Sequence, residues 1–297
     1  MKFLHIITFF SLSVIVSHAT DVAPDIYWKS VLPNTPIPKA VSDLLEIDTP
    51  HGASKPFIAS VSEQDAKKEA NHYHGLRKEA VYRLLINFFL EKDMYQGHNL
   101  DLQFPKTKTP FLARKVAETI PFSSKNLPEI YTHFSIKPDS IESETMKKTI
   151  TQCEYKGREG ETEYCATSLE DMVDFTTSEL GKKVKAITTE VYTNKVTPLQ
   201  KYAIIGATKL ATSNFVACHK LKYPHAVYYC HKDASTRLYS ISLVGEDGTK
   251  VRGLAICHKY VADMYPKDMV FKVLKVKPGS APICHVLPED HVVWVPY

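Results

Sequence analysis

The sequence has 297 residues, of which 44% are hydrophobic, and it is long enough to bury a substantial core. Its formal net charge of +4 arises from 37 basic and 33 acidic residues. These are interspersed along the chain, which argues against nucleic acid as a partner.

The first residues have the pattern of a secretory signal peptide. Lys2 precedes an apolar run over residues 3–16, and Ser17 and Ala19 are the small residues that precede a cleavage site. The run of about 14 apolar residues is shorter than the roughly 20 that a spanning helix needs, so no membrane anchor is expected. We expect residues 1–19 to be removed and the mature chain to be secreted.

Residues 20–80 are predicted to form a leader and a polar spacer. Three prolines between residues 33 and 38 favour extended structure until a short helix can begin near Lys39. Residues 48–80 are rich in polar side chains, and a spacer or an exposed helix is expected there.

The folded domain is predicted from about residue 81, where the pattern becomes dense in apolar residues. Its first half reads as mostly helical. Asp139 is predicted to cap a helix that continues through Gln152. Ser168 and Asp171 form a capping-box pattern for a second helix, which ends at Gly181.

The second half of the domain consists of short runs rich in β-branched and aromatic residues, which favour strands. The Asp247-Gly248 step between two such runs indicates a hairpin. We therefore predict an α+β fold for residues 81–297. Its helical N-terminal half packs on a C-terminal antiparallel β-sheet, stapled by disulfides.

This second half carries one dipeptide, Cys-His, four times, with spacings of 10, 25 and 25 residues. The chain has only 13 histidines, so chance rarely places one directly after a given cysteine. Adjacent side chains on a strand project to opposite faces, so each sulfur would point one way and its imidazole the other. We expect the pairs at strand ends. The pairs are Cys218-His219, Cys230-His231, Cys257-His258 and Cys284-His285.

Secretion makes disulfides the expected state of the six cysteines. Cys153 and Cys165 lie 12 residues apart across a polar loop, close enough to bond to each other, and neither precedes a histidine. If they pair, the other four pair among themselves, in a combination that the sequence leaves open. These four are Cys218, Cys230, Cys257 and Cys284.

The histidines of the four pairs form a candidate metal site. Neutral imidazole is the commonest metal ligand among side chains, and three or four of them outside the cell suit Cu(II) or Zn(II). Nitrogen ligands of this kind favour copper, and cysteines locked in disulfides would fix where the histidines point. The candidate ligands are His219, His231, His258 and His285.

Three alternatives stay open at this stage. A histidine after a cysteine is also compatible with a polar residue beside a structural disulfide. His225 and His291 are either auxiliary ligands or ordinary surface histidines, and His72 and His74 are interpreted as part of a solvated face. No nucleophile elbow, phosphate loop or dinucleotide motif occurs, so no catalytic residue is assigned.

The spacing CH-x10-CH-x25-CH-x25-CH closely resembles the signature of the plant BURP-domain family. The segments FFLEKDMYQG, YPHAVYYCH and PICHVLPEDHVVWVP are similar to family segments too, and residues 81–297 correspond to the domain. The resemblance implies a secreted plant protein of the cell wall, apoplast or seed storage compartment, acting in development or stress. A cell-wall component or a peptide is the implied partner.

Some members of this family are copper- and dioxygen-dependent cyclases that cross-link a tyrosine or tryptophan of a core peptide in their own chain. Their copper sites are built by the disulfides and histidines of the Cys-His motif, so the resemblance implies copper as the cofactor here. This chain lacks a Gln-Pro-led core peptide with a terminal Trp or Tyr. The alternative function is that of a copper-dependent oxidative peptide cyclase that cross-links Tyr or Trp side chains of a core peptide, which a relative can in principle take from a separate chain.

Overall fold

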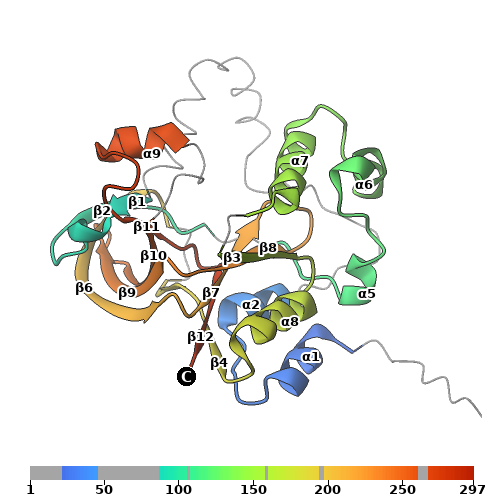
Figure 1. The fold of residues 1–297 in the computed structure, drawn as a ribbon, viewed down its shortest axis with the longest axis horizontal. Coiled ribbons are helices and arrows are strands. Elements are labelled where there is room, and N and C mark those ends of the chain that lie inside the picture. Colours follow the sequence, from blue (N-terminus) through green and yellow to red (C-terminus); the bar gives the residue numbers. More distant parts are fainter. Residues whose placement is uncertain (1–21, 46–86, 106–107, 158–159, 194–196, 260–266) are drawn as a thin grey trace, which may run out of the picture.

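The computed structural model describes residues 22–45, 87–105, 108–157, 160–193, 197–259 and 267–297. Within these ranges the chain has the α+β fold that the sequence predicts, with helices and antiparallel sheets (Figure 1). The signal peptide, the polar spacer with His72 and His74, and the predicted domain start lie outside the described residues. No helix in the described ranges is long and apolar enough to cross a membrane.

The strands form two sheets, although the sequence predicts one. The last strand explains the difference, because it pairs with two strands of the second sheet and with none of the first. The seven-stranded sheet has the order β1 (Phe88–Leu90), β11 (Ile283–Val286), β10 (Lys250–His258), β9 (Thr236–Gly245), β6 (Gln200–Thr212) and β2 (Asn99–Leu102), with β5 (Glu190–Val191) paired to β10. The five-stranded sheet has the order β3 (Glu161–Ala166), β8 (Val227–Asp233), β7 (Val216–Leu221), β12 (Val292–Pro296) and β4 (Val184–Ile187).

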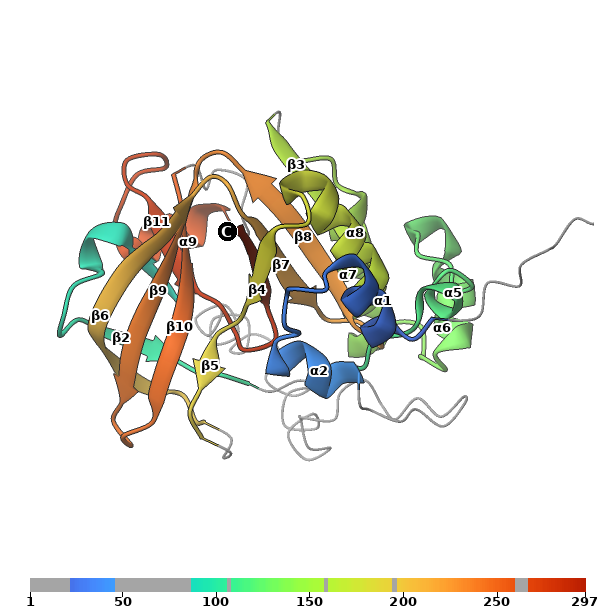
Figure 2. The same ribbon diagram turned by 90° about the horizontal axis from the view of Figure 1, so that it is seen from below.

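Most helices gather on one side of the molecule, beyond the five-stranded sheet, while α9 lies beside the seven-stranded sheet (Figures 1 and 2). The helical first half thus packs on the strands of the second half, as expected. The α-helices are α1 (Pro24–Val31), α2 (Lys39–Leu45), α5 (Arg114–Ala117), α6 (Leu127–His133), α7 (Ile141–Glu154), α8 (Leu169–Leu180) and α9 (Lys267–Leu274), and the 3-10 turns are η1 (Glu91–Asp93) and η2 (Ser124–Asn126).

Two helix starts test the capping predictions. The Ser168 hydroxyl accepts the backbone N–H of Asp171, and Gly181 ends α8 with a φ of 77°, so both ends of this helix are confirmed. The prediction of Asp139 as a cap is wrong. Ser140 caps α7 through its own hydroxyl, because Asp139 has a φ of 62°, a left-handed conformation that an aspartate tolerates in the turn before the helix.

The leader is an integral part of the fold. The short helix near Lys39 is confirmed as α2, but the chain before the prolines is helical, with Pro24 at the start of α1. Trp28 of α1 is fully buried, and its indole N–H donates to the Thr35 carbonyl over 2.7 Å. Thr35 in turn donates its hydroxyl to the carbonyl of Val184 in β4. The leader therefore covers the outer face of the five-stranded sheet.

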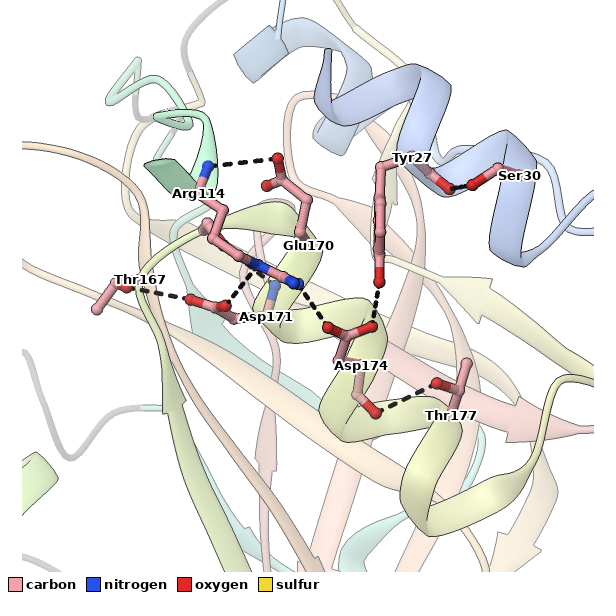
Figure 3. A network of polar contacts seen from close by, with 9 residues as sticks. Tyr27, Ser30, Arg114, Thr167, Glu170, Asp171, Asp174 and Thr177 are labelled. Atoms are coloured by element: carbon pink, nitrogen blue, oxygen red, sulfur yellow. Dashed lines mark hydrogen bonds and ion pairs between the residues drawn. The ribbon is translucent and has the colours of Figure 1, made fainter. Parts of the chain in front are cut away.

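A polar network fastens α1 and α5 to α8 (Figure 3). The Tyr27 hydroxyl donates to Asp174 over 2.5 Å, and the Arg114 guanidinium contacts Asp174 at 2.5 Å and Asp171 at 3.1 Å. The backbone N–H of Arg114 donates to the Glu170 carboxylate. Three elements that are distant in sequence are thus joined by charge-assisted hydrogen bonds.

Apolar side chains from both sheets pack in the space between them. Side chains alternate on a strand, so the neighbours of these residues along each strand point to the opposite face of their sheet. Accordingly, Cys218 and Trp294 belong to the core under the leader, and Cys257 belongs to the core on the outer face of the larger sheet. The buried residues between the sheets are Phe215, Ala217, Leu238, Leu254, Ile256, Leu287 and Val293.

Candidate metal centre

The cysteines form three disulfides. Cys153 in α7 bonds to Cys165 in β3, the pairing that their spacing of 12 residues allows, with Cα atoms 5.7 Å apart. The remaining four bond among themselves, and no cysteine of the chain is free. Each of these two bonds joins residues directly opposite one another on neighbouring strands, Cys218 with Cys230 and Cys257 with Cys284, with Cα atoms 3.9 Å apart.

The sulfurs and the imidazoles of the pairs lie on opposite faces of their sheets. Cys218 and Cys257 pack in the outer cores, whereas their neighbours His219 and His258 lie on the faces that the two sheets turn toward each other. The predicted placement at strand ends is correct only for His258, which is the last residue of β10. The other three pairs lie within their strands, because the hydrogen-bonded ladders continue beyond the histidines.

His219 lies between two other histidines. Its Nε2 atom is 3.1 Å from Nε2 of His231, and its Nδ1 atom is 3.1 Å from Nδ1 of His291. In the larger sheet, Nε2 of His258 is 3.4 Å from Nε2 of His285. The two groups meet across the sheets, with ring centroids 5.7 Å apart for His219 and His285 and 6.1 Å for His231 and His258. All four predicted ligands therefore share one cluster.

His291 joins the cluster from the connection between β11 and β12, although no cysteine precedes it. Its neighbour Asp290 lies 3.8 Å from the buried amine of Lys220, the residue after His219, and the Asp290 carbonyl accepts the hydroxyl of Tyr228. These contacts tie the connection to β7 and β8. The sequence offered only one signal for His291, its place on a short connection beside a motif strand.

His225 does not join the cluster. It is buried in the loop between β7 and β8, where its ring lies 5.0 Å from that of Tyr223 and 6.0 Å from that of Phe134. This loop packs under α6 and α7, so His225 belongs to a separate core. The alternative of a surface histidine is also wrong for His225, because the residue is only 3% exposed.

Burial favours the neutral form of three of the clustered imidazoles. It lowers the pKa of His219 well below its ordinary value, and the neighbouring histidines act in the same direction. It also lowers the pKa of His285 to about 3 and that of His291 to about 4, the latter against the opposing charge of Asp290. Neutral imidazole is the form that binds a metal ion.

The imidazole nitrogens of the cluster are of the chemical type that binds copper or zinc ions. Two nitrogens that each lie about 2 Å from one ion are roughly 3 Å from each other, which is the spacing of His219 with His231 and with His291. Among the described residues, however, no three His, Cys, Asp or Glu side chains already converge as a metal site. Binding therefore requires some rotation of the rings.

Two aromatic rings flank the cluster. The Tyr229 ring stacks on His231 with centroids 5.5 Å apart, and the Phe88 ring lies 5.6 Å from that of His285. Tyr229 precedes His231 by two residues on β8, and Phe88 comes from β1, which borders the motif strand β11. They restrict ring rotation on these sides of the cluster.

Comparison with known proteins matches residues 87–296 to a family described as the BURP domain. BURP domain protein RD22 of Arabidopsis thaliana is 49% identical over 218 residues, which cover 71% of this chain but only 55% of that protein. BURP domain-containing protein 5 of Oryza sativa subsp. japonica is 38% identical over 286 residues, covering 94% of this chain and 88% of the rice protein. BURP domain-containing protein BNM2C of Brassica napus is 38% identical over 244 residues, 77% of this chain and 87% of that protein.

Proposed function

Because the chain belongs to the plant BURP-domain family, we propose that it is a secreted protein that binds copper through the histidine cluster between its sheets. It acts in the cell wall, the apoplast or a seed storage compartment during development or stress. Its partner there is a cell-wall component or a peptide.

The observation that carries the proposal is the position of His219, whose two ring nitrogens each lie 3.1 Å from a nitrogen of another histidine. These nitrogens come from β8 and from the connection before β12, so three segments bring imidazole donors together. The donor set contains no thiolate, because all six cysteines are in disulfides. Imidazole donors without thiolate favour copper(II) over the other divalent ions of the first row.

The chain's own residues prepare the site. The two disulfides of the Cys-His pairs hold the motif strands together in register, and burial keeps His219 and His285 neutral. When bound, copper would supply one-electron chemistry with dioxygen.

Secretion is supported by two independent features. The first 19 residues have the composition of a signal peptide, and three disulfides need an oxidising compartment to persist. Expression of the full chain in plant cells, followed by N-terminal sequencing of the extracellular protein, should give a mature terminus after Ala19. Retention of the intact N-terminus inside the cell would contradict this part of the proposal.

Metal analysis of the purified mature chain tests the copper site. The protein is loaded with Cu(II) or Zn(II), desalted, and measured by mass spectrometry of the elements together with electron paramagnetic resonance. We expect stoichiometric copper with nitrogen hyperfine structure, and zinc that copper displaces. Absence of retained copper after reconstitution would refute the site.

The same preparation addresses oxidative cyclisation, which would remove two hydrogens per cross-link. Incubation of the copper-loaded protein with dioxygen and tyrosine- or tryptophan-containing peptides is followed by peptide mass spectrometry. An unchanged mass in every peptide and in the protein itself supports a role without cyclisation.

A further inference from the structure

Strand β3 places a row of carboxylates beside the histidine cluster. Oε1 of Glu161 is 3.1 Å from Nδ1 of His231, and the two side chains are only 14% and 8% exposed. Two residues further on, Glu163 accepts the Tyr229 hydroxyl and the backbone N–H of Gly157. The two carboxylates thus contact two residues of β8 that also lie two positions apart.

The register of the sheet explains this arrangement. Glu163 is directly opposite His231, and Glu161 is opposite Asp233. Alternate residues share a face, so both carboxylates lie on the face of the sheet that carries His231. From its position Glu161 reaches diagonally to the imidazole, as cross-strand neighbours do in antiparallel sheets. The Cys153–Cys165 disulfide fastens the other end of β3 to α7.

A neutral imidazole has one N–H donor and one nitrogen with a free lone pair, and the partner of one nitrogen decides the role of the other. For His231 the nitrogen facing the other histidines is Nε2, 3.1 Å from Nε2 of His219. The other nitrogen, Nδ1, is buried beside the Glu161 carboxylate. A proton on Nδ1 leaves Nε2 available as a donor to a metal.

We propose that Glu161 is a positioning residue of the metal centre: it accepts a hydrogen bond from Nδ1–H of His231 and thereby directs Nε2 of that ring toward His219. The carboxylate meets the ring outside the direction of an ideal hydrogen bond, so a small turn of the imidazole completes it. The role toward a metal rests on the proposed function. The tautomer of His231 does not.

The first test is the tautomer in metal-free protein. Two-bond nitrogen–proton correlation spectra of the ¹⁵N-labelled mature chain distinguish Nδ1–H from Nε2–H rings, and the His231→Gln variant assigns the signal. We expect Nδ1–H in the native chain, the same tautomer in Glu161→Gln, whose amide oxygen still accepts, and a shift toward Nε2–H in Glu161→Ala. An Nε2–H ring in the native chain would overturn the proposal without any variant.

Glu179→Ala is the matched control for Glu161→Ala. Glu179 contacts Lys232, the residue after His231, over 3.8 Å, so it touches the same strand through the neighbouring side chain. Removing this carboxylate should leave the His231 tautomer unchanged. A shift as large as that of Glu161→Ala would show that any carboxylate lost near β8 has the same effect, and would overturn the specific role of Glu161.

The second test is copper affinity by competition with a chelator. We expect Glu161→Ala to bind Cu(II) about 10- to 100-fold more weakly, the usual effect of removing a partner of a ligating histidine, with Glu161→Gln and Glu179→Ala near the native value. Equal affinity in native protein and Glu161→Ala would overturn the inference and leave the copper site standing. No copper in the native protein would refute the proposed function, while the tautomer result would still decide the hydrogen bond.

Discussion

Trp28, in the first helix, packs against Trp294, in the last strand, with ring centroids 4.9 Å apart, ring planes tilted by 34° and neither side chain exposed. The match to the BURP domain begins only at residue 87. The leader nevertheless supplies part of the core that this domain needs, because the outer face of the five-stranded sheet is apolar and α1 covers it.

Trp28→Ala should therefore destabilise the whole domain. Removing a fully buried indole from a packed core lowers the free energy of unfolding by about 3–5 kcal/mol. Urea denaturation of the mature chain measures this difference. Ile26→Ala in the same helix is the control, because Ile26 is 55% exposed and its loss should cost about 0.5 kcal/mol or less. A loss of stability in Trp28→Ala as small as that in Ile26→Ala would mean that the Trp28 side chain adds nothing to the core of the domain.

The elements that sequence patterns predicted correctly were those with local signals. Ser168 and Gly181 mark α8 because capping is decided within a few residues, and the Asp247-Gly248 step forms the hairpin between β9 and β10 with a φ of 82° at the glycine. The division into two sheets was missed because strand partners lie far apart in sequence. Helix α1 has no such strong local signal, because it has only 8 residues and is followed by three prolines that favour extended structure.

For the candidate site, too, the sequence predicts the residues that carry a local pattern and not those that only the fold brings together. The Cys-His dipeptide identifies four of the clustered histidines, because alternation on a strand is a local rule. His291 and Glu161 carry no such pattern, and only the folded sheets bring them to His219 and His231. The disulfide pairing likewise depended on which strands become neighbours.

Two of the disulfides allow a matched comparison, because each closes a loop with a sequence separation of 12 residues. Loss of either bond, in the double variants Cys153→Ala/Cys165→Ala and Cys218→Ala/Cys230→Ala, should lower the free energy of unfolding by about 3 kcal/mol. Only the second bond lies beside His219 and His231. We therefore expect copper retention after desalting to fall in the second variant alone. Equal copper in both would show that the hydrogen-bonded ladder by itself holds the histidines.

His219→Ala should abolish stable copper binding more completely than replacement of any other histidine, because a neutral imidazole has one lone-pair nitrogen and either nitrogen of His219 that bears it faces another histidine. Equilibrium dialysis against Cu(II) gives the bound ratio. His225→Phe is the control, since it lies in the same β7–β8 hairpin outside the cluster and keeps an aromatic ring beside Tyr223. Native-like copper binding in His219→Ala would contradict the central position of this residue.

His225 also predicts how stability depends on pH. Burial lowers its pKa to about 3 from an ordinary value of 6.5, with the nearby His133 adding slightly, and neither ring nitrogen has a hydrogen-bond partner among the described residues. The folded state keeps the ring neutral, whereas the unfolded state takes up a proton below the ordinary pKa. Its contribution is therefore complete above about pH 6.5 and is lost as the pH falls toward 3, at up to about 1.4 kcal/mol per pH unit.

Comparing native protein with His225→Phe isolates this contribution, because the other titrating groups are common to both. Between about pH 6.5 and pH 4.5 the native free energy of unfolding should fall by roughly 2–3 kcal/mol more than that of the variant. Urea denaturation at the two pH values, without metal, gives the double difference. Parallel pH profiles of native protein and variant would contradict this prediction. They would mean that the His225 ring is solvated and takes up a proton in the folded protein as readily as in the unfolded one.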